Sequence, residues 1–429
     1  MTGRTASVQA SHLTAEVMPA RLTAMVGAFA LCAFAVPVAA QTPLTRDQAL
    51  ESALSRGARV AVARADTAVA RAELLVARTF PNPSLSASYS KSFPNYHVAA
   101  DIPIDLPMLR QLRVRAAQLG LASANLRFDL ARALIALDAD TTYTLAIAAR
   151  ERLALSRRTA LDSDSLLHMV ERRRDAGDAS DMDVELARVN AGQTANIAAA
   201  DSLTLVSTLL DLQAVLGVPS DTLAIAAVDS LAMPASVFIP TSGPAGSVPI
   251  ARQTLSEAAA NLSLQSAMLS ARLQHRSLWS SPSISLGFEQ GDPDQHGILP
   301  TFGLGIGLPL FDRNRGGIAQ AEAERVRAQA ELALAQVETR NQLAHATRLR
   351  ANAMARVERD RALVASADRV AAMSLTAYRE GASTLPNVLE AQRSAREVRA
   401  QYVDDLSAVW IATAELRVLA LTPSTSSAQ

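Results

Sequence analysis

The feature that most constrains the fold of this chain is a long internal duplication. The pattern of residues 41–218 returns in residues 249–420: a short helical segment, two alternating strands, a very long helix, a glycine and a second long helix. The period is roughly 200 residues, whereas the units of solenoid proteins span about 20 to 50 residues. The sequence therefore predicts two similar halves, which build pseudo-symmetry into one chain. The anchors of the repeat are Pro83-Ser84-Leu85-Ser86 with Pro282-Ser283-Ile284-Ser285, Ile102-Pro103-Ile104 with Leu308-Pro309-Leu310, and Arg174-Asp175-Ala176-Gly177 with Arg379-Glu380-Gly381.

Composition favours closely packed helices over a thick globular core. Aromatic residues make up only 4% of the 429 residues, and alanine takes the place of large side chains. The 41 basic residues balance 41 acidic ones, and the sequence has no basic stretch of the kind that binds along a phosphate backbone. Nucleic acid is therefore not an expected partner.

Residues 1–40 have the pattern of a secretory signal peptide. An arginine precedes the apolar run 24–36, and residues 38–40 form a small-x-small cleavage site. A transmembrane anchor is the alternative, but the run is short and ends in that processing site. Met18 is a candidate for the true start. The only cysteine, Cys32, follows a leucine and not the small residue that a lipobox needs, so lipidation is not expected.

Four alternating segments form two predicted β-hairpins, 84–106 and 283–310. Leu85, Ala87 and Tyr89, for example, alternate with serines, so each strand has one apolar face and one small or polar face. No run of about 18 apolar residues follows the signal peptide, so a spanning helix is not expected and any spanning segments must be strands. A soluble hairpin packed on a helix is the alternative. The aromatic residues expected at a membrane interface are Tyr89, Phe93, Tyr96, Phe288, Phe302 and Phe311.

Four strands cannot close a barrel, and open edges are not tolerated in hydrocarbon. Other copies of the chain must therefore complete the barrel. Two copies would give eight strands around an interior filled by side chains, whereas three would give twelve strands and a lumen. A homotrimer is the smallest plausible pore.

Long helices dominate the rest of the chain. Gly177 and Gly381 suit the left-handed turn that ends a helix, so each long helix and its descending partner should form a hairpin. Residues 219–248 resemble a linker, and 421–429 are expected to be a disordered tail. The long helices are predicted at 109–175 and 313–379, and the descending helices at 180–216 and 383–420.

Two short motifs in the sequence resemble those of a known family. The run from Gly307 to Ile318, GLPLFDRNRGGI, looks like the signature of outer membrane efflux proteins, the TolC family. Phe80-Pro81-Asn82-Pro83 is similar to the CzcC/CusC-like branch that serves heavy-metal resistance-nodulation-division (RND) pumps. The resemblance implies a mostly α-helical trimer with a shared 12-stranded β-barrel in the outer membrane of a Gram-negative-type cell and a helical barrel in the periplasm. It also implies a passive channel that works with a periplasmic adaptor and an inner-membrane RND pump.

The resemblance further implies a gate at the helical tips. Tyr378 matches a tyrosine that helps to close the tip in the family, and Asn387 and Glu390 fall where aspartates line the constriction. Asp183 occupies the position of the first half that is equivalent to Asn387. Ser383 replaces a gate arginine, so the family's closed-state scheme is incomplete here. The alternatives are that Asp183 caps a helix and that Tyr378 packs at a helix end.

The sequence carries no pattern of an enzyme or of a metal or cofactor site. The histidines after the signal peptide are not at ligand spacing, and no nucleophile elbow or paired-carboxylate motif stands out. The leading prediction is an efflux channel, with heavy-metal cations as its substrates. The alternatives are an exit duct for organic toxicants or type I secreted proteins, and a soluble periplasmic coiled-coil adaptor.

Overall fold

The computed structural model describes residues 42–219, 225–234, 253–277, 282–295, 297–307, 309 and 311–423. The segments expected to be a signal peptide (1–40), a linker (219–248) and a tail (421–429) lie wholly or largely outside these residues. Met18, Cys32, Leu308 and Leu310 lie outside them as well.

Both halves contain the same principal series of elements. A helical segment leads into two strands, then into a very long helix and a shorter one. The first half has β1 (Thr42–Leu44), α1 (Arg46–Arg56), α2 (Ala58–Arg78), β2 (Ser84–Tyr89), β3 (Tyr96–Pro103), α3 (Pro107–Asp175) and α4 (Asp181–Leu216), and β4 (Ile225–Ala227) follows it. The second half has α5 (Leu255–Arg276), β5 (Ser283–Gln290), β6 (Leu299–Gly305), α6 (Arg315–Arg379) and α7 (Leu385–Leu419).

Several element ends differ from the predicted ones for local reasons. Helix α3 begins at Pro107, because the fixed φ and missing N–H of proline suit the first helical position. Helix α6 begins at Arg315, after Asn314 in the left-handed conformation. Strand β6 ends at Gly305, although the hairpin was expected to continue to residue 310.

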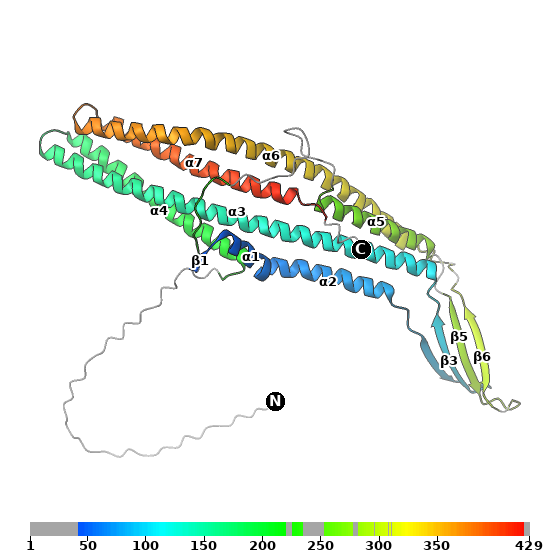
Figure 1. Ribbon diagram of the computed structural model, residues 1–429. Helices are drawn as coiled ribbons and strands as arrows, with labels where there is room; N and C mark the ends of the chain where they lie inside the picture. Colours follow the sequence, from blue (N-terminus) through cyan, green and yellow to red (C-terminus); the bar gives the residue numbers. More distant parts are fainter. Residues whose placement is uncertain are drawn as a thin grey trace, which may run out of the picture. The chain divides into compact units, whose positions relative to one another are not determined.

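The strands form a four-stranded sheet in the order β2-β3-β5-β6, and all neighbours are antiparallel. The central pair β3 and β5 joins the two halves of the chain, with Ala100 opposite Leu286. Figure 1 shows these strands next to the ends of α3 and α6. This position follows from the chain itself, because β3 and β6 lead directly into those two helices.

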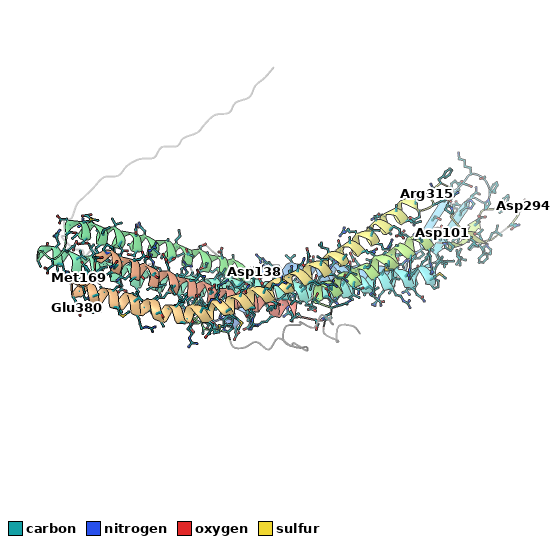
Figure 2. The ribbon with its side chains drawn as sticks, turned by 90° about the horizontal axis from the view of Figure 1, so that it is seen from above. Asp101, Asp138, Met169, Asp294, Arg315 and Glu380 are labelled. Carbon is teal, nitrogen blue, oxygen red and sulfur yellow. The ribbon has the colours of Figure 1, made fainter. Side chains whose placement is uncertain are left out.

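The long helices form two antiparallel hairpins, α3 with α4 and α6 with α7, and α3 also packs against α7. Helices α2 and α5 lie along the first part of α3. Figure 2 shows Met169 and Glu380 at one end of the helices, Asp101 and Arg315 at the other, and Asp138 between them. Small side chains, such as Ala139 and Ala146, supply much of the buried apolar set, as the composition predicts for helices in close contact.

A small parallel sheet, β1 with β4, was not anticipated from the sequence. Thr42 pairs with Ile225, so the beginning of the first half lies beside the segment that follows it. The core cluster that contains Ile225 and Ala227 of β4 also includes Tyr143, Ile147 and Leu212, all three fully buried. The cluster joins α1, α3, α4 and β4 near the middle of α3.

The expectation that no helix is apolar enough to cross a membrane was wrong for α4. Among the residues that the structure describes, α4 alone has the length and composition for it, with a mean hydropathy of 1.3 over its most apolar window. Polar residues interrupt that window, so the sequence contains no continuous apolar run. Only 22% of that window is buried in this chain, and α4 packs against α3 in the helical hairpin.

Candidate functional site: an open sheet and two helical tips

One face of the four-stranded sheet is apolar and exposed in the part of the chain that the structure describes. The register aligns Leu85, Ala100, Leu286 and Phe302 in one row across all four strands. Leu85 is 77% exposed and Phe302 is 80% exposed. An apolar face of this extent is costly in water, so this face requires a cover of lipid or protein.

The opposite face of the sheet is polar. Ser285 donates a hydrogen bond to the Oδ1 atom of Asp101, and the Nδ1 atom of His97 lies 3.2 Å from the Oε1 atom of Glu289. Thr301 and Gly303 lie on the same face. The sheet therefore separates a face suited to apolar surroundings from a face suited to water.

The two edges of the sheet are open. Among the described strands, β2 pairs only with β3 and β6 pairs only with β5. Because every neighbouring pair is antiparallel, β2 and β6 run in opposite directions. An edge of one copy can therefore pair with the other edge of a second copy and keep the antiparallel pattern.

The predicted interface aromatics lie at different levels of this sheet. Tyr89 and Tyr96 are directly opposite each other, with ring centroids 5.3 Å apart, next to the loop that holds Phe93. Phe288 lies two residues before the partner of Tyr96. Phe302 lies farther along β6, and the fully exposed Phe311 follows the strands, just before α6.

Both helical tips are closed by the same glycine turn. Gly177 has φ +86° and Gly381 has φ +76°, values that favour glycine over residues with a side chain. The N–H of Asp178 donates to the carbonyl of Arg173 at 2.7 Å, and the N–H of Ala382 donates to that of Ala377 at 2.8 Å. These bonds are the signature of a Schellman cap and show that the duplication extends to backbone detail.

Tyr378 joins the two helical hairpins just before the second tip. Its ring is buried with Val170, Val184 and Val388 in one apolar cluster. Arg173 lies over the ring, 4.8 Å from its centroid, and donates a hydrogen bond to the carbonyl of Tyr378. Burial raises the pKa of Tyr378 above its ordinary value; the positive charge of Arg173 offsets part of this rise, and the negative charge of Asp183 adds a smaller increase.

The hydroxyl of Tyr378 is buried without a hydrogen-bond partner among the described residues. Because an unpaired buried hydroxyl costs free energy, Tyr378→Phe should leave the free energy of unfolding unchanged or raise it by up to about 1 kcal/mol. Tyr378→Ala, which also removes the ring, should lower it by about 3–5 kcal/mol. Unfolding in detergent measures both changes. A loss of about 1 kcal/mol in Tyr378→Phe would instead mean that the hydroxyl bonds to a group outside this chain.

Asp183 caps helix α4. Ser180 is the N-cap residue; its Oγ atom accepts the N–H of Asp183 at 3.1 Å, and the Oδ2 atom of Asp183 accepts the N–H of Ser180 at 3.1 Å. This capping box gives Asp183 the structural role that the sequence left as an alternative. The corresponding helix α7 begins after Thr384, which makes no side-chain cap bond.

Asn387 and Glu390 lie on exposed parts of α7. Asn387 occupies the same position after its N-cap as Asp183 does, and its Nδ2 atom is 3.4 Å from the Oγ atom of Ser383. Glu390 pairs with Arg393 at 3.2 Å. The described residues thus bring Tyr378 and Asp183 close together, while Asn387 and Glu390 remain on the surface of their own helix.

Arg173 is a tip residue that the sequence did not predict. It lies in the run Arg172-Arg173-Arg174, in the last turn of α3, where basic residues favour a helix C-terminus. That charge pattern was visible in the sequence. Its contact with Tyr378 was not, because the two residues belong to different halves of the chain.

Comparisons with known proteins agree with this architecture. Residues 251–420 match the family model described as outer membrane efflux protein. No curated protein sequence matches the chain.

Solved structures share the fold across both halves. VceC from Vibrio cholerae, an outer membrane protein, is 18% identical, with 88% of this chain and 96% of that chain covered and a TM-score of 0.73. The CmeC outer membrane channel of Campylobacter jejuni is 16% identical, with coverage of 87% and 85% and a TM-score of 0.75. CusC, described for transmembrane channel formation, is 18% identical, with coverage of 88% and 92% and a TM-score of 0.73. At such identities the likeness is one of fold, and CusC is no more similar than VceC.

Proposed function

We propose that this chain, whose residues 251–420 match the family model described as outer membrane efflux protein, is the outer-membrane channel component of a tripartite efflux system. The observation that carries the proposal is the two-faced sheet with open edges. Its apolar face suits lipid, and its polar face suits a water-filled lumen. A soluble periplasmic adaptor would have no use for an exposed row such as Leu85, Leu286 and Phe302.

In the proposed assembly, three chains close a 12-stranded barrel. Strand β6 of each chain pairs with β2 of the next, because the two edges run in opposite directions. Every backbone group in the hydrocarbon layer then has a partner, as a membrane requires. Tyr89 and Tyr96 would lie at one membrane interface and Phe311 at the other.

The helices form the periplasmic part of the proposed channel. Helix α3 has 69 residues, and at 1.5 Å per residue it is about 100 Å long, several times the thickness of a bilayer. Its tip, with that of α6, would reach a periplasmic adaptor and an inner-membrane RND pump. Export is passive, and the channel itself needs no cofactor and performs no catalysis.

Heavy-metal cations are the proposed substrates. Support comes from the Phe80-Pro81-Asn82-Pro83 motif and from the carboxylates Asp183 and Glu390 near the tips, which would attract cations around a narrow opening. Organic toxicants or secreted proteins are the alternative cargo. Deletion of the gene separates them: unchanged tolerance to zinc, cobalt, cadmium, copper and silver with higher sensitivity to dyes would reject the metals and keep the channel.

Planar-bilayer recordings test the tip carboxylates. Glu390→Gln and Asp183→Asn channels should each lose about half of the cation-to-anion permeability ratio, because each removes one negative charge per chain near the opening. Glu338→Gln is the matched control, since Glu338 is exposed on α6 and distant from the tip. Equal ratios in all four channels would return Asp183 to its capping role alone and would remove Glu390 from the gate.

A further inference from the structure

A shallow hollow lined by arginines lies where α2 ends and α3 begins, next to the sheet. Its volume is about 350 Å³. The lining consists of Arg78, Arg110, Gln111, Val114, Arg115 and Gln118, and it contains no carboxylate. Only cationic, amide and apolar side chains would therefore contact a ligand in the hollow, which favours an anion.

The positive charge at this hollow is not neutralised by the chain itself. The Nη2 atom of Arg113 lies 2.7 Å from the Oδ2 atom of Asp105, whereas the Nε atom of Arg110 lies 3.8 Å from the same oxygen. Among the described residues, Asp105 is the only carboxylate within ion-pair distance of these arginines. Arg78 and Arg115 are exposed, and their side chains have no partner in that part of the chain. Four arginines thus share one carboxylate.

Exposed apolar side chains lie between the arginines and the sheet. Phe80 is 66% exposed and Met108 is 62% exposed. The guanidinium carbon of Arg110 lies 4.4 Å from the centroid of the Phe80 ring. Because the chain passes from the strands through these residues into α3, apolar groups come first and arginines follow. A bilayer surface has the same order, with hydrocarbon first and phosphate next to it.

The second half of the chain has the same charge at the same level. Arg313 and Arg315 are exposed at the beginning of α6, and Figure 2 shows Arg315 at the sheet end of the helices. The nearest carboxylate in sequence, Asp312, accepts the N–H of Asn314 at 2.8 Å. Both junctions between strands and long helices are therefore basic, although the net charge of the whole chain is zero.

We propose that Arg78, Arg110 and Arg115 bind the phosphate headgroup of an anionic phospholipid whose acyl chains contact Phe80 and Met108. The inference rests on the proposed membrane function and assigns the lipid to the leaflet nearest the long helices. Guanidinium groups suit this ligand because their N–H groups form a planar fork that matches phosphate oxygens. The exposed apolar side chains next to the arginines favour a lipid over free phosphate.

Native mass spectrometry of the full chain in detergent tests the site, with phosphatidylglycerol and phosphatidylcholine added as probes. Wild type should bind phosphatidylglycerol about tenfold more tightly, because only this lipid has a net negative headgroup. The double variant Arg78→Gln/Arg115→Gln should lose most of this preference and keep the melting temperature of wild type. Arg340→Gln/Arg361→Gln is the matched control and should keep the preference, since it removes two exposed arginines from α6, far along the helix from the sheet.

Three outcomes would overturn the proposal. They are equal binding of the two lipids by wild type, an unchanged preference in Arg78→Gln/Arg115→Gln, and displacement of phosphatidylglycerol by inorganic phosphate at a similar concentration. Insertion into vesicles of phosphatidylcholine separates this inference from the proposed function. A wild-type chain that inserts but shows no lipid preference would reject the lipid site alone, whereas a chain that inserts into no vesicle would reject the channel and the lipid site with it.

Discussion

Arg46→Ala should lower the free energy of unfolding by about 3 kcal/mol, because it leaves a buried carboxylate without its main partner. The guanidinium of Arg46 is ion-paired with Asp140, whose side chain is 8% exposed. The same guanidinium lies 4.0 Å from the ring centroid of Trp410 on α7. Arg417 is 3.9 Å from Asp140 and compensates only in part. Thermal and denaturant unfolding in detergent would measure the loss.

A matched control lies on the next helix. Arg59 pairs with Asp138 and joins α2 to α3, as Arg46 joins α1 to α3, but its side chain is 67% exposed. Arg59→Ala should therefore cost less than about 1 kcal/mol. Adding Asp140→Asn to Arg46→Ala should recover part of the loss by removing the stranded charge. Equal losses in the free energy of unfolding for Arg46→Ala and Arg59→Ala would contradict this explanation.

The backbone around Arg46 explains why the position matters to more than one element. Its N–H donates to the Oδ2 atom of Asp229 at 2.9 Å, and the hydroxyl of Tyr143 donates to the same oxygen at 2.8 Å. Burial raises the pKa of Tyr143 to about 12, so this hydroxyl remains a donor at every physiological pH. The network fastens β1 and the segment after β4 to the middle of α3.

Gly287→Val should prevent the central strands of the sheet from pairing. A Cβ atom at Gly287 would lie 2.6 Å from the carbonyl oxygen of Val98 and 2.7 Å from the Oγ1 atom of Thr301. The first of these is backbone and cannot move without breaking the β3–β5 ladder. We expect a loss of at least about 2 kcal/mol and a fall of about tenfold or more in membrane-inserted oligomer, measured by native electrophoresis of detergent extracts.

Gly303→Ala provides the comparison within the same sheet. Its added Cβ atom would meet only the side chain of Ser285, 3.2 Å away. A small shift of that serine should accommodate the methyl group, so the yield of oligomer should stay within about twofold of wild type. Similar yields for Gly287→Val and Gly303→Ala would show that close strand contact at Gly287 is not required.

The faces of the strands and the long helices could be predicted from the sequence, because local patterns encode them. The alternation in 84–90 and 283–290 assigned Leu85 and Leu286 to the apolar side of their strands, and the register places them in one row. Long helices followed from proline-free apolar stripes ended by Gly177 and Gly381. These features depend on residues close to one another in the chain.

Contacts between distant segments could not be predicted in this way. Strands β1 and β4 have three residues each, which is too short to show an alternating pattern in the sequence. The partners of Arg46 are far from it in the sequence. For Asp183, the sequence allowed both a cap and a gate; the hydrogen bonds to Ser180 show the cap, and the gate stays a proposal.

The opposite direction of the two edge strands has a consequence for how copies come together. In the proposed ring, two joined chains share one seam and still leave two strands unpaired. The third chain forms two further seams in a single step and leaves none. Addition of the third chain therefore forms two strand seams, whereas the association of the first two chains forms one. Dimeric intermediates should be scarce, and assembly should depend steeply on the concentration of newly exported chains.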